Sequence, residues 1–477
     1  MRNLNLTMLM DFYELTMANG FFEHHKSEQK AVFDVFFRMN SDDASYAIFA
    51  GLDQIIDYLL DLKFNDDDIK YLESFNCFSK EFLNYLKNFK FHADIYAFKE
   101  GSIIYPNEPI ITVCGSLIEC QLLETMLLLV FNHSSLIATK AKRITLAAKD
   151  RIVSDFGARR AHNYAAAIYG ARAAYIGGVG STSNVLASKL FNIPCSGTMA
   201  HSWVMAFDSE YEAFLAYSKT YPDNAVLLID TYDVLKSGLV NAIKVNNDYL
   251  VKHGSYLKGV RIDSGDLAYL SKEVRRILDE NHLEKTKIFV SNALDEFKIN
   301  SLLQQGAKID AFGVGENLMT GKPNPVFGGV YKLVAIEENN EFIPRIKLSN
   351  TVEKITNPGF KEVYRVFKNG KAIADLLTLK GEEVDLTKPY HIYDSNKLYK
   401  ENLYLEGCEL KKMHVEIFKN GELVYKRPSL DEIRDYVNYQ INNELWEEET
   451  RLYYPHLHYL DFSPKLKDVK VRLMKNE

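Results

Sequence analysis

The order of apolar and polar residues predicts strands alternating with helices from about residue 170 to about residue 330. Short apolar runs such as AVLLID (225–230) and GVRID (259–263) are each followed by a stretch with helical spacing. A continuous apolar run is typical of a strand buried on both faces, and the alternation predicts right-handed βαβ units around a parallel sheet. At least five such units in succession favour a barrel, with an open doubly wound sheet as the alternative. The runs at 173–178 and 194–199 are expected to be two further strands.

The regions on either side have a different pattern. Residues 31–39 have the β-branched and aromatic composition of a strand, and residues 46–64 have the apolar spacing of a helix. Beyond residue 330, two copies of FKNG (367–370 and 418–421) lie between β-like runs, and Asn-Gly in this setting predicts β-hairpins. A charged helix is expected from residue 429. The chain therefore reads as mixed α and β at its start and β-rich in its last third.

Polar residues and glycines gather where the predicted strands end. These positions are Gly177–Gly178, Thr198–His201, Asp230, Asp263, Asn292 and Gly313–Gly315. The carboxyl ends of strands are where α/β barrels and open parallel sheets place their ligands. We therefore expect a binding site at this edge.

The segment GVRIDSGD carries the most specific candidate chemistry. Arg261 and Asp263 are two residues apart, so on a strand both side chains project from one face. Together they can bind an anion and a sugar hydroxyl or a hydrated cation. The alternative is a buried ion pair that only braces the sheet, but the following Ser-Gly-Asp, in which Gly265 frees the backbone, favours function.

Two other motifs suit anions. Gly313 and Gly315 close a predicted strand and can present backbone amides to a phosphate, although a tight turn is an equal alternative, and neither a Walker loop nor a dinucleotide fingerprint occurs. Arg159 and Arg160, in DFGARR, suit a carboxylate or a phosphate, the alternative being a solvated helix face.

His201, in SGTMAHSW, stands without a second histidine at ligand spacing, and the chain has neither HExxH nor GxSxG. A lone histidine is most often structural. At the end of a strand and after a Gly-Thr turn, however, a neutral imidazole can accept a phosphoryl group as a covalent nucleophile.

Composition narrows the possible partners. The 477 residues are 47% hydrophobic and 12% aromatic with a formal net charge of −7, which argues against disorder and gives no basic field for nucleic acid. The five cysteines include no C-x-x-C pair, which fits a reducing cytoplasm. The start of the chain does not read as a signal peptide, and the apolar run 126–131 is too short to span a bilayer. We expect a cytoplasmic protein without nucleic-acid or membrane partners.

The motifs together resemble the nicotinate phosphoribosyltransferase family over most of the chain. The segments that carry the resemblance, in the family's order, are DFYELTMANGFF, FDVFFR, EGSIIYPNEPI, QLLET, DFGARRAH, YIGGVGSTSNVLA, GTMAHS, LIDTYDVLKSG, GVRIDSGDL, VSNALDE and GVYKLVA. The resemblance implies an irregular TIM-like α/β barrel, with an α+β domain built from the N-terminal and C-terminal segments. The expected domains are 1–125 (α+β), 126–335 (barrel with the active site) and 336–477 (β-rich, ending in a helix).

The resemblance also implies an activity. Such enzymes transfer the phosphoribosyl group of phosphoribosyl pyrophosphate to nicotinic acid, giving nicotinate mononucleotide and pyrophosphate for NAD synthesis. ATP is a co-substrate, Mg²⁺ is required, and the expected assembly is a homodimer with shared active sites. His201 matches the histidine that takes the γ-phosphoryl of ATP, and Asp263 is the expected second catalytic residue and the contact, through water, for Mg²⁺.

The resemblance assigns the other site residues as well. The expected nicotinate-binding residues are Tyr13 (from the other subunit), Phe156, Arg159, Thr182, Thr198 and Arg261. The expected phosphate-binding residues are Arg160, Ser291, Asn292, Gly313 and Gly315. Thr182 stands where the related nicotinamide enzyme has an aspartate, so the acid should be preferred over the amide.

One position departs from the family pattern. Relatives often have a small hydroxyl residue where this chain has Glu316. A carboxylate repels phosphate unless Mg²⁺ intervenes.

Two alternatives to the ATP-coupled nicotinate enzyme stay open at this point: a nicotinamide-using relative, and a catalytically silent barrel that binds phosphorylated ligands or partners.

Overall fold

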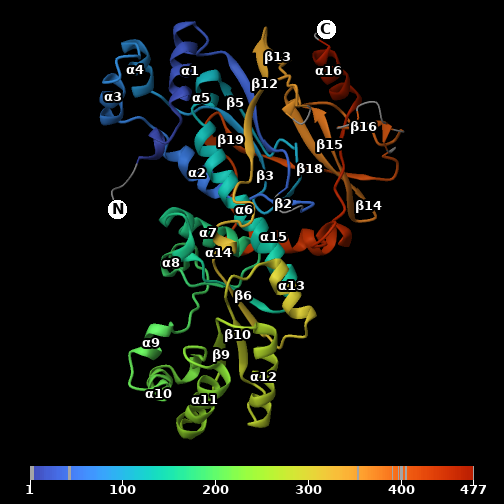
Figure 1. The fold of residues 1–477 in the computed structure, drawn as a ribbon. Helices are drawn as coiled ribbons and strands as arrows, with labels where there is room; N and C mark the ends of the chain where they lie inside the picture. Colours follow the sequence, from blue (N-terminus) through green and yellow to red (C-terminus); the bar gives the residue numbers. More distant parts are fainter. Residues whose placement is uncertain are drawn as a thin grey trace. The chain divides into compact units, whose positions relative to one another are not determined.

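The computed structural model describes residues 5–40, 44–351, 354–388, 390–395, 397, 401–402 and 405–475. The chain forms two compact units. One joins Met1–Leu136 to Val326–Glu477, and the other is Ile137–Pro325. In Figure 1 the first unit combines blue with orange and red segments, whereas the second is green to yellow. The units divide at residues 136/137 and 325/326, while the domain boundaries expected at 125/126 and 335/336 stay a prediction.

The second unit is built on a parallel sheet. Its strands, in spatial order, are β7 (Ser181–Thr182), β6 (Ile152–Asp155), β11 (Ala311–Val314), β10 (Lys287–Val290), β9 (Gly259–Ile262) and β8 (Val226–Leu228). Every neighbouring pair is parallel. The predicted mixed α/β class with a parallel sheet is therefore confirmed. Closure of this sheet into a barrel stays a prediction, since within the described residues no strand pairing joins β7 to β8.

The helices of the second unit connect these strands. They are α7 (Tyr164–Ile176), α8 (Val185–Phe191), α9 (His201–Met205), α10 (Glu210–Thr220), α11 (Leu239–Val245), α12 (Leu267–Glu280), α13 (Glu296–Gln304) and α14 (Glu316–Met319). The end of the GVRIDSGD motif starts one of them. Gly265 takes a φ of +77°, and the carboxylate of Asp266 accepts the N–H groups of Ala268 at 3.1 Å and Tyr269 at 3.0 Å, which caps α12.

Two strand predictions are wrong. Most of the run 173–178 lies in α7, because its alanine-rich sequence has high helix propensity and Asn163 caps the helix by accepting the N–H of Ala166 at 2.9 Å. In the run 194–199, Cys195 makes only an isolated bridge to Thr182. The strands that fill these places in the sheet are β6, with the sequence IVSD, and β7, with the sequence ST, and neither contains an apolar run.

The first unit contains an antiparallel sheet made from both ends of the chain. Its spatial order is β13 (Glu341–Pro344), β12 (Gly329–Glu338), β1 (Lys30–Phe37), β5 (Ile111–Ser116), β3 (Asp94–Phe98), β19 (His414–Lys419) and β20 (Glu422–Leu423). Pairing of β1 with β12 and of β3 with β19 joins segments about 300 residues apart. This pairing explains why the two ends of the chain share one hydrophobic core.

A second, mixed sheet and two hairpins complete the first unit. The sheet has the order β17 (Glu401–Asn402), β16 (Ile392–Asp394), β21 (Leu460–Phe462), β15 (Lys371–Leu379), β14 (Lys361–Lys368) and β18 (Glu409–Lys412). Both predicted FKNG hairpins are confirmed, since β14–β15 and β19–β20 are antiparallel pairs. Both residues of each Asn-Gly turn have positive φ, as this turn type requires. A short pair, β2 (Ala47–Ile48) and β4 (Ile103–Ile104), lies outside these sheets.

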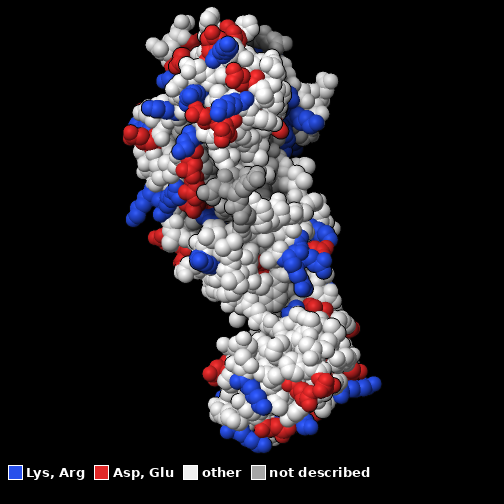
Figure 2. All heavy atoms as spheres, turned by 90° about the vertical axis from the view of Figure 1, so that its left-hand side faces the viewer, with Lys and Arg blue, Asp and Glu red and all other residues white. Residues whose placement is uncertain are grey.

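The helices of the first unit are α1 (Phe12–Glu23), α2 (Leu52–Asp61), α3 (Asp66–Glu73), α4 (Lys80–Lys87), α5 (Leu117–Gln121), α15 (Leu430–Tyr439) and α16 (Pro464–Met474); α6 (Glu124–Ala148) starts there and continues into the second unit. The stretch Leu117–Ala148 is long and apolar enough to cross a bilayer, but 67% of its most apolar window is buried, as in the core helix of a folded domain. On the face that Figure 2 shows, Lys and Arg form small groups that alternate with acidic groups.

Candidate active site

A cavity of about 290 Å³ lies in the second unit where β6, β9, β10 and β11 end. Its lining residues are Phe156, Arg159, Arg160, Arg261, Asp263, Ser291, Asn292, Ala293, Gly313, Gly315 and Glu316. Nine of these are residues that the sequence assigned to nicotinate, phosphate or catalysis. The structure therefore brings most of the predicted site together, at the sheet edge where parallel sheets bind ligands.

Arg261 is the best-anchored cation of the cavity. Its guanidinium donates from Nε to the Ser291 hydroxyl at 3.0 Å, from Nη1 to the Thr198 hydroxyl at 3.1 Å and from Nη2 to Asp263 Oδ1 at 3.4 Å. The Ser291 hydroxyl also donates to Asp263 Oδ1. The guanidinium carbon lies 5.3 Å from the centre of the Phe156 ring. An arginine held in this way is oriented in advance for a planar anion such as a carboxylate.

His201 is tied to this network by Asp230, a residue to which the sequence assigned no role. The Asp230 side chain follows β8 and is only 1% exposed, whereas that of His201 is 40% exposed. Asp230 Oδ1 lies 3.1 Å from His201 Nε2, and its Oδ2 accepts the N–H of Asp263 at 3.0 Å and the Ser264 hydroxyl at 2.6 Å. The buried carboxylate thus fixes one imidazole nitrogen and leaves the other for a ligand.

Phe156 owes its position to a carboxylate and two glycines. The buried Asp155 accepts the N–H of Gly157 at 2.7 Å, and burial raises the pKa of this carboxyl. The backbone N–H of Phe156 donates to the carbonyl of Val314 at 2.7 Å. The ring rests directly on Gly313, where a Cβ would lie 2.5 Å from Phe156 Cδ2. A glycine at residue 313 is therefore a condition for this ring position.

Thr182, a predicted nicotinate contact, lies beneath this loop rather than on the wall of the cavity. Its side chain is buried. The hydroxyl donates to Asp155 Oδ2 at 2.7 Å and accepts the N–H of Asn184 at 3.0 Å. Thr182 therefore contacts Asp155, and an aspartate here would place two carboxylates side by side. Its predicted effect on the choice between acid and amide stays a prediction.

Tyr13, the other predicted nicotinate contact, belongs to the first unit. It lies on α1 and is 44% exposed. Partial burial, followed by the charge of Glu124, raises the pKa of its phenol, so the hydroxyl stays protonated. Its predicted place in the site of another subunit stays a prediction.

The loop after β10 and the turn after β6 complete the wall of the cavity. Asn292 and Ala293 both have positive φ, +105° and +46°. Consecutive non-glycine residues in this region are strained, and such strain is enriched at functional sites. Arg159 and Arg160 lie in the short helical turn Ala158–Arg160. Arg159 and Arg160 give this wall two cations, which suits an anionic ligand.

The residues present fit Mg²⁺ only together with a substrate. Among the described residues no group of three or more His, Cys, Asp or Glu side chains is arranged to hold a metal ion. Asp263 supplies one carboxylate at the cavity. Magnesium is usually bound through one or two carboxylates plus the phosphates of a substrate, so this donor set fits that mode.

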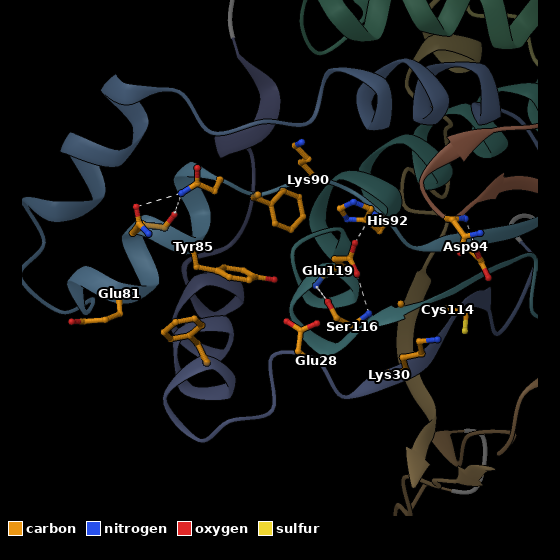
Figure 3. Close-up of a pocket in the computed structure, with 16 residues that line it drawn as sticks. Glu28, Lys30, Glu81, Tyr85, Lys90, His92, Asp94, Cys114, Ser116 and Glu119 are labelled. Atoms are coloured by element: carbon orange, nitrogen blue, oxygen red, sulfur yellow. Dashed lines mark hydrogen bonds between the residues drawn. The ribbon is translucent and has the colours of Figure 1, made fainter. Parts of the chain in front are cut away.

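A larger hollow of about 820 Å³ lies in the first unit, with Glu81 and Tyr85 on one side and Asp94 and Cys114 on the other (Figure 3). The carboxylate of Glu119 is used structurally, since it accepts the N–H groups of His92 at 2.6 Å and Ser116 at 3.0 Å. Burial raises the pKa of Cys114 to about 11, so this thiol is a poor nucleophile. The smaller cavity of the second unit is therefore the candidate active site.

Comparisons with known proteins show the family to which the chain is similar. Models of the nicotinate phosphoribosyltransferase N-terminal domain, family and C-terminal domain match residues 8–132, 152–369 and 360–470. The chain is 42% identical to nicotinate phosphoribosyltransferase of Bacillus subtilis, covering 96% of this chain and 93% of that protein. It is 35% identical to that of Caenorhabditis elegans, covering 96% and 92%. The crystal structure of human nicotinic acid phosphoribosyltransferase superposes with a TM-score of 0.86 at 27% identity, covering 97% and 99%.

Proposed function

The chain belongs to the nicotinate phosphoribosyltransferase family, and from this premise we propose that it couples ATP hydrolysis to phosphoribosyl transfer through His201. Family membership supports nicotinic acid and phosphoribosyl pyrophosphate as substrates in NAD salvage. The observation that carries the proposal is the contact between His201 and the buried Asp230, which also holds the backbone of Asp263 at the cavity.

Nicotinate binding follows from the orientation of Arg261. Its guanidinium pairs with the carboxylate of nicotinate, and the ring of Phe156 offers a face for the pyridine. Arg159 adds positive charge at the same wall. Nicotinamide has no negative charge to balance these arginines, so the acid is preferred.

The transfer step needs positioning and charge more than covalent catalysis. The pyridine nitrogen forms a bond to the anomeric carbon of the ribose as the bond to pyrophosphate breaks, and pyrophosphate leaves with that electron pair. Because positive charge develops on the sugar, an in-line geometry and a neutralised leaving group lower the barrier. When bound with the substrate, Mg²⁺ would supply part of that neutralisation, and Asp263 is the residue that would hold it.

His201 carries the coupling. The ring nitrogen that Asp230 does not hold attacks the γ-phosphorus of ATP, the bond to the β-phosphate oxygen breaks, and ADP leaves. Asp230 stabilises the positive charge that develops on the imidazole, and water later takes the phosphoryl group from His201. The free energy of that hydrolysis is then available to shift the transfer equilibrium.

Residues on α1 favour a homodimer. Tyr13 and its neighbours Phe12 and Met17 are 44%, 52% and 42% exposed. Neighbouring exposed apolar side chains of this kind are typical of surfaces that a partner covers. A second copy that receives Tyr13 in its own site accounts for this exposure.

The purified protein tests the proposal directly. It is incubated with phosphoribosyl pyrophosphate, Mg²⁺ and either nicotinate or nicotinamide, with and without ATP, and the mononucleotide product is measured. We expect nicotinate mononucleotide, in larger amount with ATP. Turnover of nicotinamide alone would overturn the proposal, and turnover of neither base would favour a catalytically silent binding protein.

A further inference from the structure

Glu316 places a negative charge among the cations of the cavity. It is the first residue of α14 and lines the cavity directly after Gly315. Its Oε1 pairs with Nζ of Lys322, and its Oε2 lies 3.8 Å from Nε of Arg160. One carboxylate therefore bridges two basic side chains, both more than half exposed.

This arrangement is electrostatically suited to competition with a phosphate. The lining residues Arg159, Arg160 and Arg261 carry three positive charges against the two negative charges of Asp263 and Glu316. Lys322, through its hydrogen bond and its charge, lowers the pKa of Glu316, so the carboxylate stays ionised at neutral pH. A phosphate group carries more negative charge than a carboxylate and accepts more hydrogen bonds, so it is the stronger partner for the same two cations.

We propose that Glu316 is an internal competitor for the phosphate-binding part of the site, and that Lys322 is a further phosphate-binding residue. A phosphate of the substrate displaces the Glu316 carboxylate from Arg160 and Lys322 and takes its place between them. When the product leaves, Glu316 pairs with both cations again. This inference rests on the proposed function, which supplies phosphoribosyl pyrophosphate as the phosphate-bearing substrate.

Removing Glu316 should change the affinity for phosphate in opposite directions, depending on whether Glu316 competes with phosphate or binds a metal ion. If Glu316 competes with phosphate, its removal strengthens phosphate binding, because two cations are released and a repulsive charge is lost. If Glu316 instead holds Mg²⁺ for the phosphate, its removal weakens phosphate binding. The direction of one measured change therefore separates the two roles.

The test uses Glu316→Gln and Lys322→Gln in the full-length protein. Glu280→Gln is the matched control, because Glu280 pairs with Arg276 on the exposed face of α12 and its loss changes the net charge by the same amount. Binding of pyrophosphate with Mg²⁺ is measured by calorimetry, and the KM for phosphoribosyl pyrophosphate is measured at two ionic strengths.

We expect Glu316→Gln to tighten pyrophosphate binding and lower this KM by about two- to fivefold, the range for exposed charge pairs, with a smaller effect at high salt. Lys322→Gln should weaken both by a similar factor, and Glu280→Gln should change neither. Weaker pyrophosphate binding by Glu316→Gln, or no change in either variant, would overturn the inference.

The test of Glu316 and Lys322 can succeed or fail independently of the test of the proposed function. Calorimetry with pyrophosphate requires no turnover, so it tests Glu316 and Lys322 even if the wild-type protein makes no nicotinate mononucleotide. Conversely, a wild-type protein that turns over nicotinate, with variants that bind pyrophosphate as the wild type does, would leave the proposed function standing without the competitor.

Discussion

At the scale of single residues, the site depends on side chains that hold other side chains. Asp230 holds His201 and the backbone of Asp263, and Asp155 holds the turn that carries Phe156. Gly313 acts by having no side chain, since the Phe156 ring lies where its Cβ would be. Each of these residues acts on the ligand through a neighbour, so its effect should be confined to the part of the substrate that the neighbour contacts.

Gly313→Ala tests this idea at the nicotinate ring. The added methyl group must displace the Phe156 ring, which lies beside Arg261. We therefore expect the KM for nicotinate to rise about tenfold, a typical cost of overpacking, with little change in the KM for phosphoribosyl pyrophosphate. Gly180→Ala is the control, because the atom nearest to its new Cβ is 3.6 Å away. A rise in the KM for the phosphoribosyl donor instead would mean that Gly313 serves phosphate binding.

Residues whose role follows from the local sequence pattern could be predicted. Residues whose contact partners lie far away in the sequence were missed. Arg261 and Asp263 could be found because alternation on one strand places them on one face. Asp155 and Asp230 could not be assigned, because their partners Thr182 and His201 are 27 and 29 residues away and meet them only through strand pairing and folding. The position of Asp230 at the end of a strand beside GVRID was the available signal.

At the scale of elements, helix α1 exposes Tyr13 and buries the carboxyl group of Glu14. Burial raises the pKa of Glu14 from 4.5 to about 7, and among the described residues its Oε2 has no hydrogen-bond partner. Its Oε1 accepts the N–H of Asp11 and that of Thr125, both at 3.2 Å. The stability contributed by Glu14 is thus complete below about pH 4.5 and is lost as the pH rises through about 7.

Glu14→Gln should therefore stabilise the protein at high pH. The amide keeps an acceptor oxygen and carries no charge, so we expect the free energy of unfolding to exceed that of the wild type by about 1 kcal/mol at pH 8, with a smaller difference at pH 5. Denaturant unfolding at both pH values measures it. A difference that does not grow with pH would show that Glu14 is not the titrating group.

Elements were predicted well where hydrophobic pattern and local chemistry agree. The strands β8 to β11 have apolar runs, and the two FKNG hairpins have the turn residues that their backbone needs. The prediction failed at α7, whose alanine-rich end is as apolar as a buried strand. An apolar run of this length does not separate a buried helix from a buried strand, and here helix propensity and the Asn163 cap decided.

At the scale of the whole molecule, the residues that the resemblance assigns to the site come from both compact units. His201 and Phe156 belong to one unit, and Tyr13 belongs to the other. Long-range pairing of β1 with β12 was beyond prediction from the sequence, because no local signal specifies which of many strands pair. If the sites are shared in a homodimer, two variants that are each inactive should regain activity when mixed. A site formed by a single chain does not predict this recovery.

Mixing two inactive variants tests the shared site. Subunits carrying Tyr13→Ala and subunits carrying His201→Ala, refolded together, should regain about a quarter of wild-type ATP-coupled activity. The reason is that about half of randomly formed dimers contain both variants, and each of these has one intact site. Mixing Phe156→Ala with His201→Ala is the control, since both residues belong to one subunit's site and no activity should return. Equal recovery in both mixtures, or in neither, would contradict shared sites.

The most direct test of the central claim is the amount of ATP hydrolysed for each nicotinate mononucleotide formed, measured in the wild type and in His201→Ala. We predict that the wild type hydrolyses ATP in a nicotinate-dependent manner, and that His201→Ala loses this hydrolysis while retaining some transfer without ATP. Nicotinate-dependent ATP hydrolysis that survives intact in His201→Ala would contradict the assignment of His201 as the phosphoryl acceptor.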